Sequence, residues 1–157
     1  MSTKGNVLAQ YLGSGDPALK NYYPAWLDNM ADDVTLEGSM LDGVVQGAEA
    51  VRSVVVTIRS LYDRQEHKFA GPYGESGFLE EYVAEVRGEP IGCVVLVTRN
   101  AAGQTKHVVA SYRPRSALLL FSRLLGEKFA GTPIAEHFAA PASLETDRPM
   151  AVTGAKR

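Results

Sequence analysis

Residues 78–114 read FLEEYVAEVRGEPIGCVVLVTRNAAGQTKHVVASYRP, and this stretch decides the fold. Apolar and polar side chains alternate along it with a period of two, which is typical of β-strands. Residues 87–90 (RGEP) and 100–103 (NAAG) contain the Gly, Asn and Pro that favour hairpin turns. The stretch therefore predicts three antiparallel strands joined as a meander.

The two faces of this meander differ in character. We assign one face to the core because it is apolar in almost every register; it consists of Tyr82, Ala84, Val86, Ile91, Cys93, Val95, Val97, Val108, Ala110 and Tyr112. The other face is mixed, and its apolar members are Val83, Val94, Leu96 and Val109. Exposed together, they would form an apolar patch, so we expect a homodimer through this outer sheet face. The charged members, expected to form cross-strand ion pairs, are Glu81, Glu85, His107 and Arg113.

The composition indicates one globular domain with neither nucleic-acid nor membrane partners. The chain has 157 residues, a net charge of −2 and no long basic run, which argues against a nucleic-acid binder. No apolar run approaches membrane-spanning length, and residues 1–5 (MSTKG) do not begin a signal peptide. The single cysteine, Cys93, excludes an internal disulfide and fits a reducing compartment. We expect a cytoplasmic protein with one domain over residues 1–130 (core 16–129) and a C-terminal tail over 131–157.

Two amphipathic helices are expected to cover the apolar face of the meander. Asp16 and Pro17 are a typical helix start, and apolar residues at helical spacing extend this first helix to about residue 31. Gly47 opens the second helix, whose outer side carries Arg52, Arg59 and Asp63. Its expected buried stripe consists of Val51, Val54, Val55, Ile58, Leu61 and Tyr62.

Shorter elements connect these parts. Residues 34–37 alternate as a short strand, residues 66–70 form a weaker one, and residues 71–74 (GPYG) read as a loop. After the meander, Ser116 is expected to cap a helix over 117–129 that is apolar on more than one side.

Two further segments carry a family resemblance. Residues 31–37 read ADDVTLE and residues 45–51 read VQGAEAV. They resemble the pattern ADDVxxE…hxGxEAV of the nuclear-transport-factor-2-like superfamily, particularly its SnoaL-like members and the related ketosteroid isomerases. Residues 103–114 look like the end of that domain. The resemblance implies an α+β, cystatin-like fold: a cone-shaped, curved antiparallel sheet wrapped around an N-terminal helix, here with an extra C-terminal helix and tail.

The resemblance also implies a ligand pocket between the sheet and the first helix. Its expected wall consists of Tyr23, Trp26, Met30, Leu36, Tyr82, Ala84, Val95, Ala110 and Tyr112. For most of these residues core packing is the alternative role. Trp26, Tyr82 and Tyr112 are the better ligand-binding candidates, because each combines an aromatic body with a polar group.

Glu80 is the candidate acid/base residue of this pocket. It shares strand parity with Tyr82 and should therefore point inward, where burial disfavours the charged form of a carboxyl group and suits it to proton transfer. The alternative is that Glu80 lies at the start of the strand and is solvated. We favour this second interpretation, because strand starts are poorly placed by sequence patterns.

Other sites have less support. The resemblance places the base of the ketosteroid isomerases at Gly38 and their protonated Asp nearest to Val95, and neither residue can move a proton. His67 and His137 are isolated in the sequence, and His107 is expected on the outer face, so no metal or other cofactor is predicted.

Two functions remain open. The first is a SnoaL-like enzyme acting by acid/base catalysis on a small, apolar, cyclic molecule, with Glu80 moving the proton and Tyr82 and Tyr112 orienting a carbonyl or hydroxyl group. The second is a non-catalytic ligand-binding or dimeric interaction module of the same fold.

Overall fold

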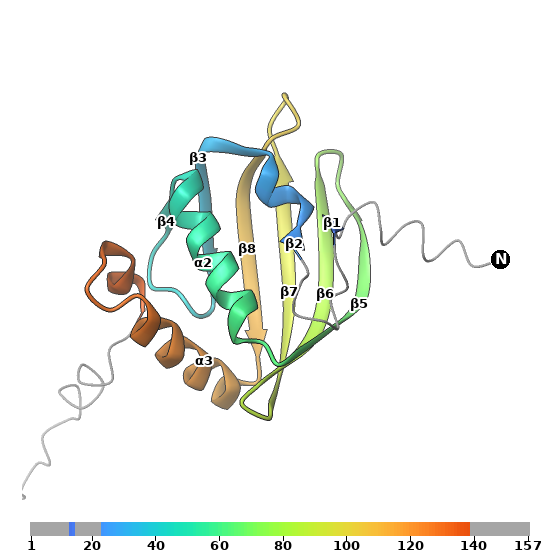
Figure 1. The fold of residues 1–157 in the computed structure, drawn as a ribbon. Helices are drawn as coiled ribbons and strands as arrows, with labels where there is room; N and C mark the ends of the chain where they lie inside the picture. Colours follow the sequence, from blue (N-terminus) through green and yellow to red (C-terminus); the bar gives the residue numbers. More distant parts are fainter. Residues whose placement is uncertain (1–12, 15–22, 139–157) are drawn as a thin grey trace, which may run out of the picture.

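Six strands form one curved sheet, and a long helix crosses its concave face (Figure 1). The computed structural model describes residues 13–14 and 23–138. The elements in chain order are β1 (Gly13–Ser14), β2 (Tyr23–Pro24), the 3-10 helix η1 (Ala25–Asp28), β3 (Met30–Gly38), β4 (Val45–Gln46), α2 (Ala48–Leu61), β5 (Arg64–Tyr73), β6 (Gly77–Val86), β7 (Glu89–Arg99), β8 (Thr105–Arg113), α3 (Arg115–Lys128) and the 3-10 helix η2 (Pro133–His137).

The predicted meander is confirmed as β6, β7 and β8, which pair antiparallel in sequence order. Strand order across the sheet is β4-β3-β8-β7-β6-β5, and β3 runs parallel to its neighbour β8. The turn between β6 and β7 consists of Arg87 and Gly88, which both have positive φ angles of 50° and 79°. Such a pair matches the twist of the flanking strands, so the hairpin closes with two residues.

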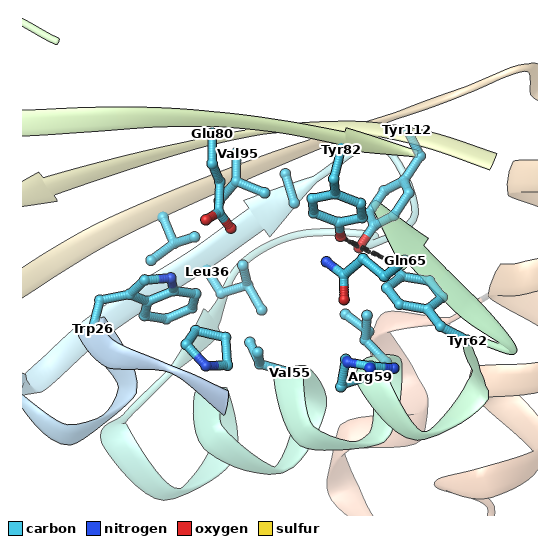
Figure 2. Close-up of a pocket in the computed structure, with 14 residues that line it drawn as sticks. Trp26, Leu36, Val55, Arg59, Tyr62, Gln65, Glu80, Tyr82, Val95 and Tyr112 are labelled. Atoms are coloured by element: carbon cyan, nitrogen blue, oxygen red, sulfur yellow. Dashed lines mark hydrogen bonds between the residues drawn. The ribbon is translucent and has the colours of Figure 1, made fainter. Parts of the chain in front are cut away.

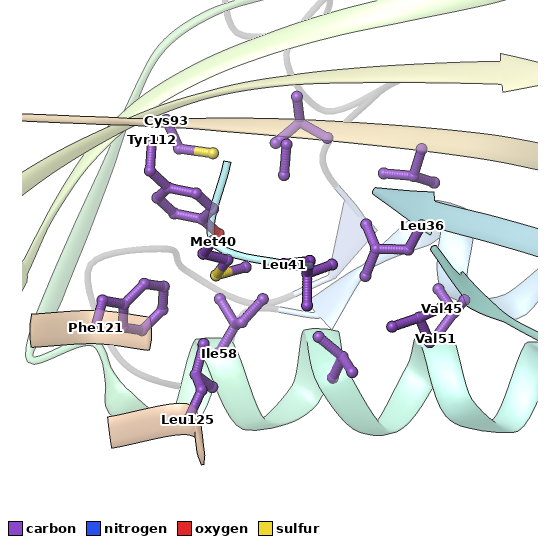
Figure 3. Close-up of a cluster of buried hydrophobic side chains, with 14 of the residues drawn as sticks. Leu36, Met40, Leu41, Val45, Val51, Ile58, Cys93, Tyr112, Phe121 and Leu125 are labelled. Carbon is purple, nitrogen blue, oxygen red and sulfur yellow. The ribbon is translucent and has the colours of Figure 1, made fainter. Parts of the chain in front are cut away.

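The core lies between the concave face of the sheet and α2, and α3 closes one end of it (Figure 3). Every residue assigned to the apolar face of the meander is buried, which confirms the strand parity. From α2, Val51, Val54 and Ile58 are buried against the sheet, while Phe121 and Leu125 of α3 fill the end near Tyr112. A single apolar core thus unites both helices with the sheet.

The expected helix over residues 16–31 is wrong where the structure describes it. Residues 23–31 form β2, η1 and the first residues of β3, and residues 16–22 lie outside the described part. Pro24 gives the physical reason: a proline inside a helix removes a backbone donor and clashes with the preceding turn. Trp26 and Leu27 are buried as predicted, but from a single 3-10 turn.

Two smaller expectations need correction, and the expected tail contains one described element. Strand β5 runs from Arg64 to Tyr73, so it is longer than the expected strand and includes most of the expected loop over 71–74. The residue preceding α3 is Pro114, and Ser116 lies inside that helix, where it is not a cap. Beyond α3, residues 131–138 of the expected tail include η2, after which Phe138 is buried with its ring stacked on Phe129 at 5.9 Å.

The helices offer no membrane-spanning segment within the described residues. None of them is both long enough and apolar enough to cross a bilayer.

Candidate functional site

A cavity lies between the concave face of the sheet, η1 and α2 (Figure 2). Its wall consists of Pro24, Trp26, Leu36, Val55, Ile58, Arg59, Tyr62, Gln65, Glu80, Tyr82, Val95, Val108, Ala110 and Tyr112. The volume open to water-sized molecules is about 40 Å³. One water needs about 10–15 Å³, so this volume corresponds to about three waters.

Two backbone carbonyls hold η1 above this cavity. The Leu27 carbonyl accepts a hydrogen bond of 2.9 Å from Arg52 of α2, and the Trp26 carbonyl accepts one of 3.4 Å from the hydroxyl of Thr105 in β8. These contacts tie the 3-10 turn to both the helix and the sheet, so the Trp26 indole has a defined place in the cavity wall.

Glu80 points into this cavity from β6 (Figure 2). Its side chain is buried, at 3% exposed, so the favoured interpretation of a solvated strand start is wrong. The carboxyl oxygen Oε2 lies 3.7 Å from Nε2 of His67, whose side chain is equally buried. The structure therefore places a carboxyl and an imidazole side by side under the sheet, next to an otherwise largely apolar wall.

Strand β5 contains a bulge directly after His67. The register of β5 on β6 shifts between His67 and Phe69, so His67 pairs with Tyr82 and Ala70 pairs with Glu80. His67 also packs against the ring of Tyr82, with ring centroids 5.4 Å apart. The sequence showed His67 as isolated, since its partner lies on the neighbouring strand and no local spacing reveals it.

Three tyrosine hydroxyls meet at the other end of the cavity (Figure 2). The hydroxyls of Tyr62 and Tyr82 lie 2.7 Å apart, Tyr62 donates to Tyr112 at 3.2 Å, and Tyr82 and Tyr112 are 3.4 Å apart. Burial raises the pKa of all three tyrosines well above 10, so the hydroxyls remain neutral donors. Burial also raises the pKa of the neighbouring Cys93 thiol to about 12.

Two further polar side chains of the wall were not predicted as site residues. Arg59 was expected on the outer side of its helix, yet it is only 8% exposed and lines the cavity. Gln65, at the start of β5, is buried beside it. Arg59 is one residue after Ile58 and so lies at the edge of the buried stripe, a place that helical periodicity assigns poorly.

The predicted ligand-binding residues divide into three groups. Those that line the cavity are Trp26, Leu36, Tyr82, Val95, Ala110 and Tyr112. Met30 and Ala84 are buried in the core but do not line the cavity. Tyr23 lies in β2, and its side chain is outside the described part of the chain. The binding roles of all these residues stay predictions.

The two positions to which the sequence resemblance assigns the carboxyl groups of ketosteroid isomerases have no polar side chain here. Val95 is an apolar part of the cavity wall. Gly38 lies where β3 approaches β8, and a Cβ atom at that position would collide with the carbonyl of Ala110. The backbone thus leaves no room for a side chain at residue 38.

The remaining histidines lie elsewhere. The Nδ1 atom of His107 lies 2.6 Å from the Thr35 hydroxyl, and its Nε2 lies 3.8 Å from the Glu37 carboxylate. Nδ1 of His137 is 2.9 Å from the carbonyl of Asp42. Among residues 13–14 and 23–138, no group of three or more His, Cys, Asp or Glu side chains could hold a metal ion.

The expected ion pairs on the outer sheet face are partly present. Arg113 forms a 2.8 Å pair with Glu81 across the intervening strand, whereas Glu85 pairs at 3.0 Å with Arg64 of β5. These carboxylates are partly exposed, in contrast to the buried Glu80.

Comparison with known proteins identifies the fold of this chain. No family model matches the chain, and no curated protein matches its sequence. Among solved structures, a steroid delta-isomerase from Pseudomonas aeruginosa is similar, with a TM-score of 0.62 and 15% identity over 66% of this chain and 77% of that one. An uncharacterized protein with a cystatin-like fold from Silicibacter pomeroyi gives a TM-score of 0.63 and 15% identity over 68% of this chain and 74% of that one.

A third similar structure is a de novo designed protein with a curved β-sheet. Its TM-score is 0.56, with 20% identity over 79% of this chain and 99% of the designed one. Because a designed scaffold and an isomerase both match, the likeness establishes the architecture and says nothing about activity. The chain therefore has an α+β, cystatin-like fold with a curved antiparallel sheet, as its sequence resemblance implies.

Proposed function

We propose that this protein is an enzyme of the SnoaL-like type that moves a proton on a small cyclic molecule. The observation that carries the proposal is the arrangement of the cavity, in which the buried carboxyl of Glu80 shares one wall with three tyrosine hydroxyls. A ring bound between them would present a carbon or oxygen to Glu80 and an oxygen to Tyr82 or Tyr112. The largely apolar remainder of the wall suits the body of such a ring.

The chemistry follows from the two ends of the cavity. Glu80 would take a proton from the carbon next to a carbonyl group and return it to another atom of the same molecule. A tyrosine hydroxyl would donate a hydrogen bond to the carbonyl oxygen and stabilise the negative charge that develops there. The 3.4 Å contact between Tyr82 and Tyr112 is the longest of the three, so it would yield most readily to the ligand.

Proton abstraction can be tested without the natural substrate. Cyclohexanone in heavy water exchanges the hydrogens next to its carbonyl for deuterium, and NMR follows the rate. We expect the wild-type protein to accelerate this exchange and Glu80→Gln to lower the accelerated rate by about a hundredfold or more, as for other general bases. Unchanged exchange in Glu80→Gln would remove this residue from the role.

A matched control lies on the opposite face of the same strand. Glu81→Gln makes the same chemical change at the neighbouring residue, which is partly exposed and paired with Arg113 at 2.8 Å. This variant should exchange at the wild-type rate. Far-UV circular dichroism and thermal unfolding of both variants separate a loss of chemistry from a loss of fold.

A non-catalytic ligand-binding module is the second candidate function. The residues that favour it are Gly38 and Val95, which stand where related isomerases carry carboxyl groups. Binding of cyclohexanone without any acceleration of exchange by the wild-type protein would assign the cavity to this second function.

The outer sheet face supports a further proposal, that two copies of the chain form a homodimer in the cytoplasm. Four apolar residues on that face remain partly exposed in the single chain: Val83, Val94, Leu96 and Val109. Pairing two such faces would remove this apolar surface from water.

A further inference from the structure

Three buried polar atoms of the cavity wall have no hydrogen-bond partner among the described residues. They are Nε1 of Trp26, Oε1 of Gln65 and Oε2 of Glu80. The three residues are 6%, 3% and 3% exposed, so bulk water does not satisfy these atoms. All three side chains line the same cavity, although they come from η1, β5 and β6 respectively.

Such a grouping needs a physical explanation. A buried polar atom without a partner destabilises the fold, and native proteins leave few of them. Core packing would bury apolar atoms here at no such cost. In Figure 2 the Trp26 indole and the Glu80 carboxyl lie on facing walls, with Gln65 nearer the tyrosines. The three atoms are therefore placed to bind the polar groups of a ligand.

The hydrogen-bonding state of these three side chains differs from that of the tyrosines. The tyrosine hydroxyls already bond to one another. The indole of Trp26 can only donate, whereas the carbonyl oxygen of Gln65 and a carboxyl oxygen of Glu80 can accept. Nε2 of His67 lies 3.7 Å from Oε2 of Glu80, which is longer than a hydrogen bond. A complementary ligand must therefore accept one hydrogen bond and donate at least one.

We propose that the ligand of this cavity carries a hydroxyl group, which accepts from Trp26 and donates to Glu80 or Gln65. A hydroxyl is a small group that is donor and acceptor at once, so it can satisfy an indole N–H and a carboxyl or amide oxygen together. This inference rests on the proposed function only in taking the same cavity as the ligand site. It replaces the expected apolar ligand with a ring that carries a hydroxyl group.

Two ring compounds of nearly equal size test this proposal. The probes are 4-hydroxycyclohexanone and 4-methylcyclohexanone, each titrated into the full chain with ligand-detected NMR. A purely apolar wall would favour the methyl compound because it is the less costly one to remove from water. The proposal requires the opposite order, with the hydroxyl compound binding about tenfold more tightly.

Variants connect this preference to the named atoms. Trp26→Phe removes the donor and Gln65→Leu removes one acceptor, so each should reduce the hydroxyl-over-methyl ratio by severalfold. Val55→Ala changes an apolar part of the same wall and should leave the ratio unchanged. Thermal unfolding of each variant confirms that it is folded.

Three results would overturn the proposal: equal or tighter binding of the methyl compound, no binding of either probe, or an unchanged ratio in both Trp26→Phe and Gln65→Leu. These readouts are equilibrium affinities and need no turnover. Failure of deuterium exchange would therefore count against the proposed catalysis alone, while loss of the hydroxyl preference would count against this inference alone.

Discussion

The tyrosine cluster makes the stability of the fold sensitive to alkaline pH. Tyr62, Tyr82 and Tyr112 have pKa values raised by burial, whereas in the unfolded chain they ionise near the ordinary value of 10.0. Above pH 10 the unfolded state therefore loses protons that the folded state keeps. The stability that these groups contribute is complete below pH 10, and it falls as the pH rises above that value.

The magnitude follows from the number of groups. For each tyrosine that ionises only in the unfolded chain, every pH unit above 10 lowers the free energy of unfolding by about 1.4 kcal/mol. Three such tyrosines together lower it by about 4 kcal/mol per pH unit. Cys93, with its pKa raised from 9.0 to about 12, adds a loss of similar size per unit beginning near pH 9. Since small domains are stable by about 5–15 kcal/mol, the protein should unfold within one to two units above pH 10.

Urea unfolding of wild type and Tyr62→Phe between pH 8 and 11 measures this effect. At pH 8 the variant loses hydrogen bonds to Tyr82 at 2.7 Å and to Tyr112 at 3.2 Å, so we expect a loss of about 1–3 kcal/mol. Towards pH 11 the difference in free energy of unfolding between wild type and the variant should shrink by about 1.4 kcal/mol, because the variant lacks one of the titrating tyrosines.

The matched control is Tyr73→Phe, which removes a hydroxyl from a residue that is 56% exposed. Its stability should follow that of wild type at every pH. A constant difference between Tyr62→Phe and wild type from pH 8 to pH 11 would refute the reasoning, since it would mean that the folded and unfolded states titrate alike.

Three other perturbations have defined outcomes. Gly38→Ala should destabilise the protein by several kcal/mol or prevent folding, because its Cβ would collide with the backbone of β8; thermal unfolding measures this. Phe121→Ala should cost about 3–5 kcal/mol in urea unfolding, whereas Leu119→Ala, at a residue 56% exposed on the same helix, should cost less than 1 kcal/mol. Leu96→Asp should convert the proposed dimer to a monomer in sedimentation at micromolar concentration, and a wild-type monomer would contradict the dimer proposal.

Most of the sheet could be predicted from the sequence. Alternation over 78–114 predicted the three long strands and their buried face, because a strand with one side in the core must place apolar residues at every second position. The same rule predicted the inward direction of Tyr82 and Tyr112. The error over residues 23–31 arose from an apolar pattern with helical spacing that passed over Pro24.

The site was predictable only where regular alternation continues. Trp26, Leu36 and Tyr82 were predicted in the wall and line it. His67 was missed because its partner Glu80 lies on the neighbouring strand, and no spacing within a single strand reveals such a pair. Arg59 was missed for a different reason: a charged residue at the edge of a helical stripe is usually exposed, and only tertiary packing buries it here.

The bulge in β5 also decides which side chain lies opposite Glu80. Residues directly opposite each other on paired strands lie on the same face of the sheet. With uninterrupted alternation after His67, the inward residue of β5 opposite Glu80 would be Phe69, and its ring would compete with any ligand for the space under the sheet. The register shift instead sets Ala70 opposite Glu80 and leaves Phe69 on the outside, 49% exposed. One extra residue in an edge strand thus keeps a large ring away from Glu80. Bulges are over-represented beside active sites for this reason: they re-aim side chains without changing the rest of the fold.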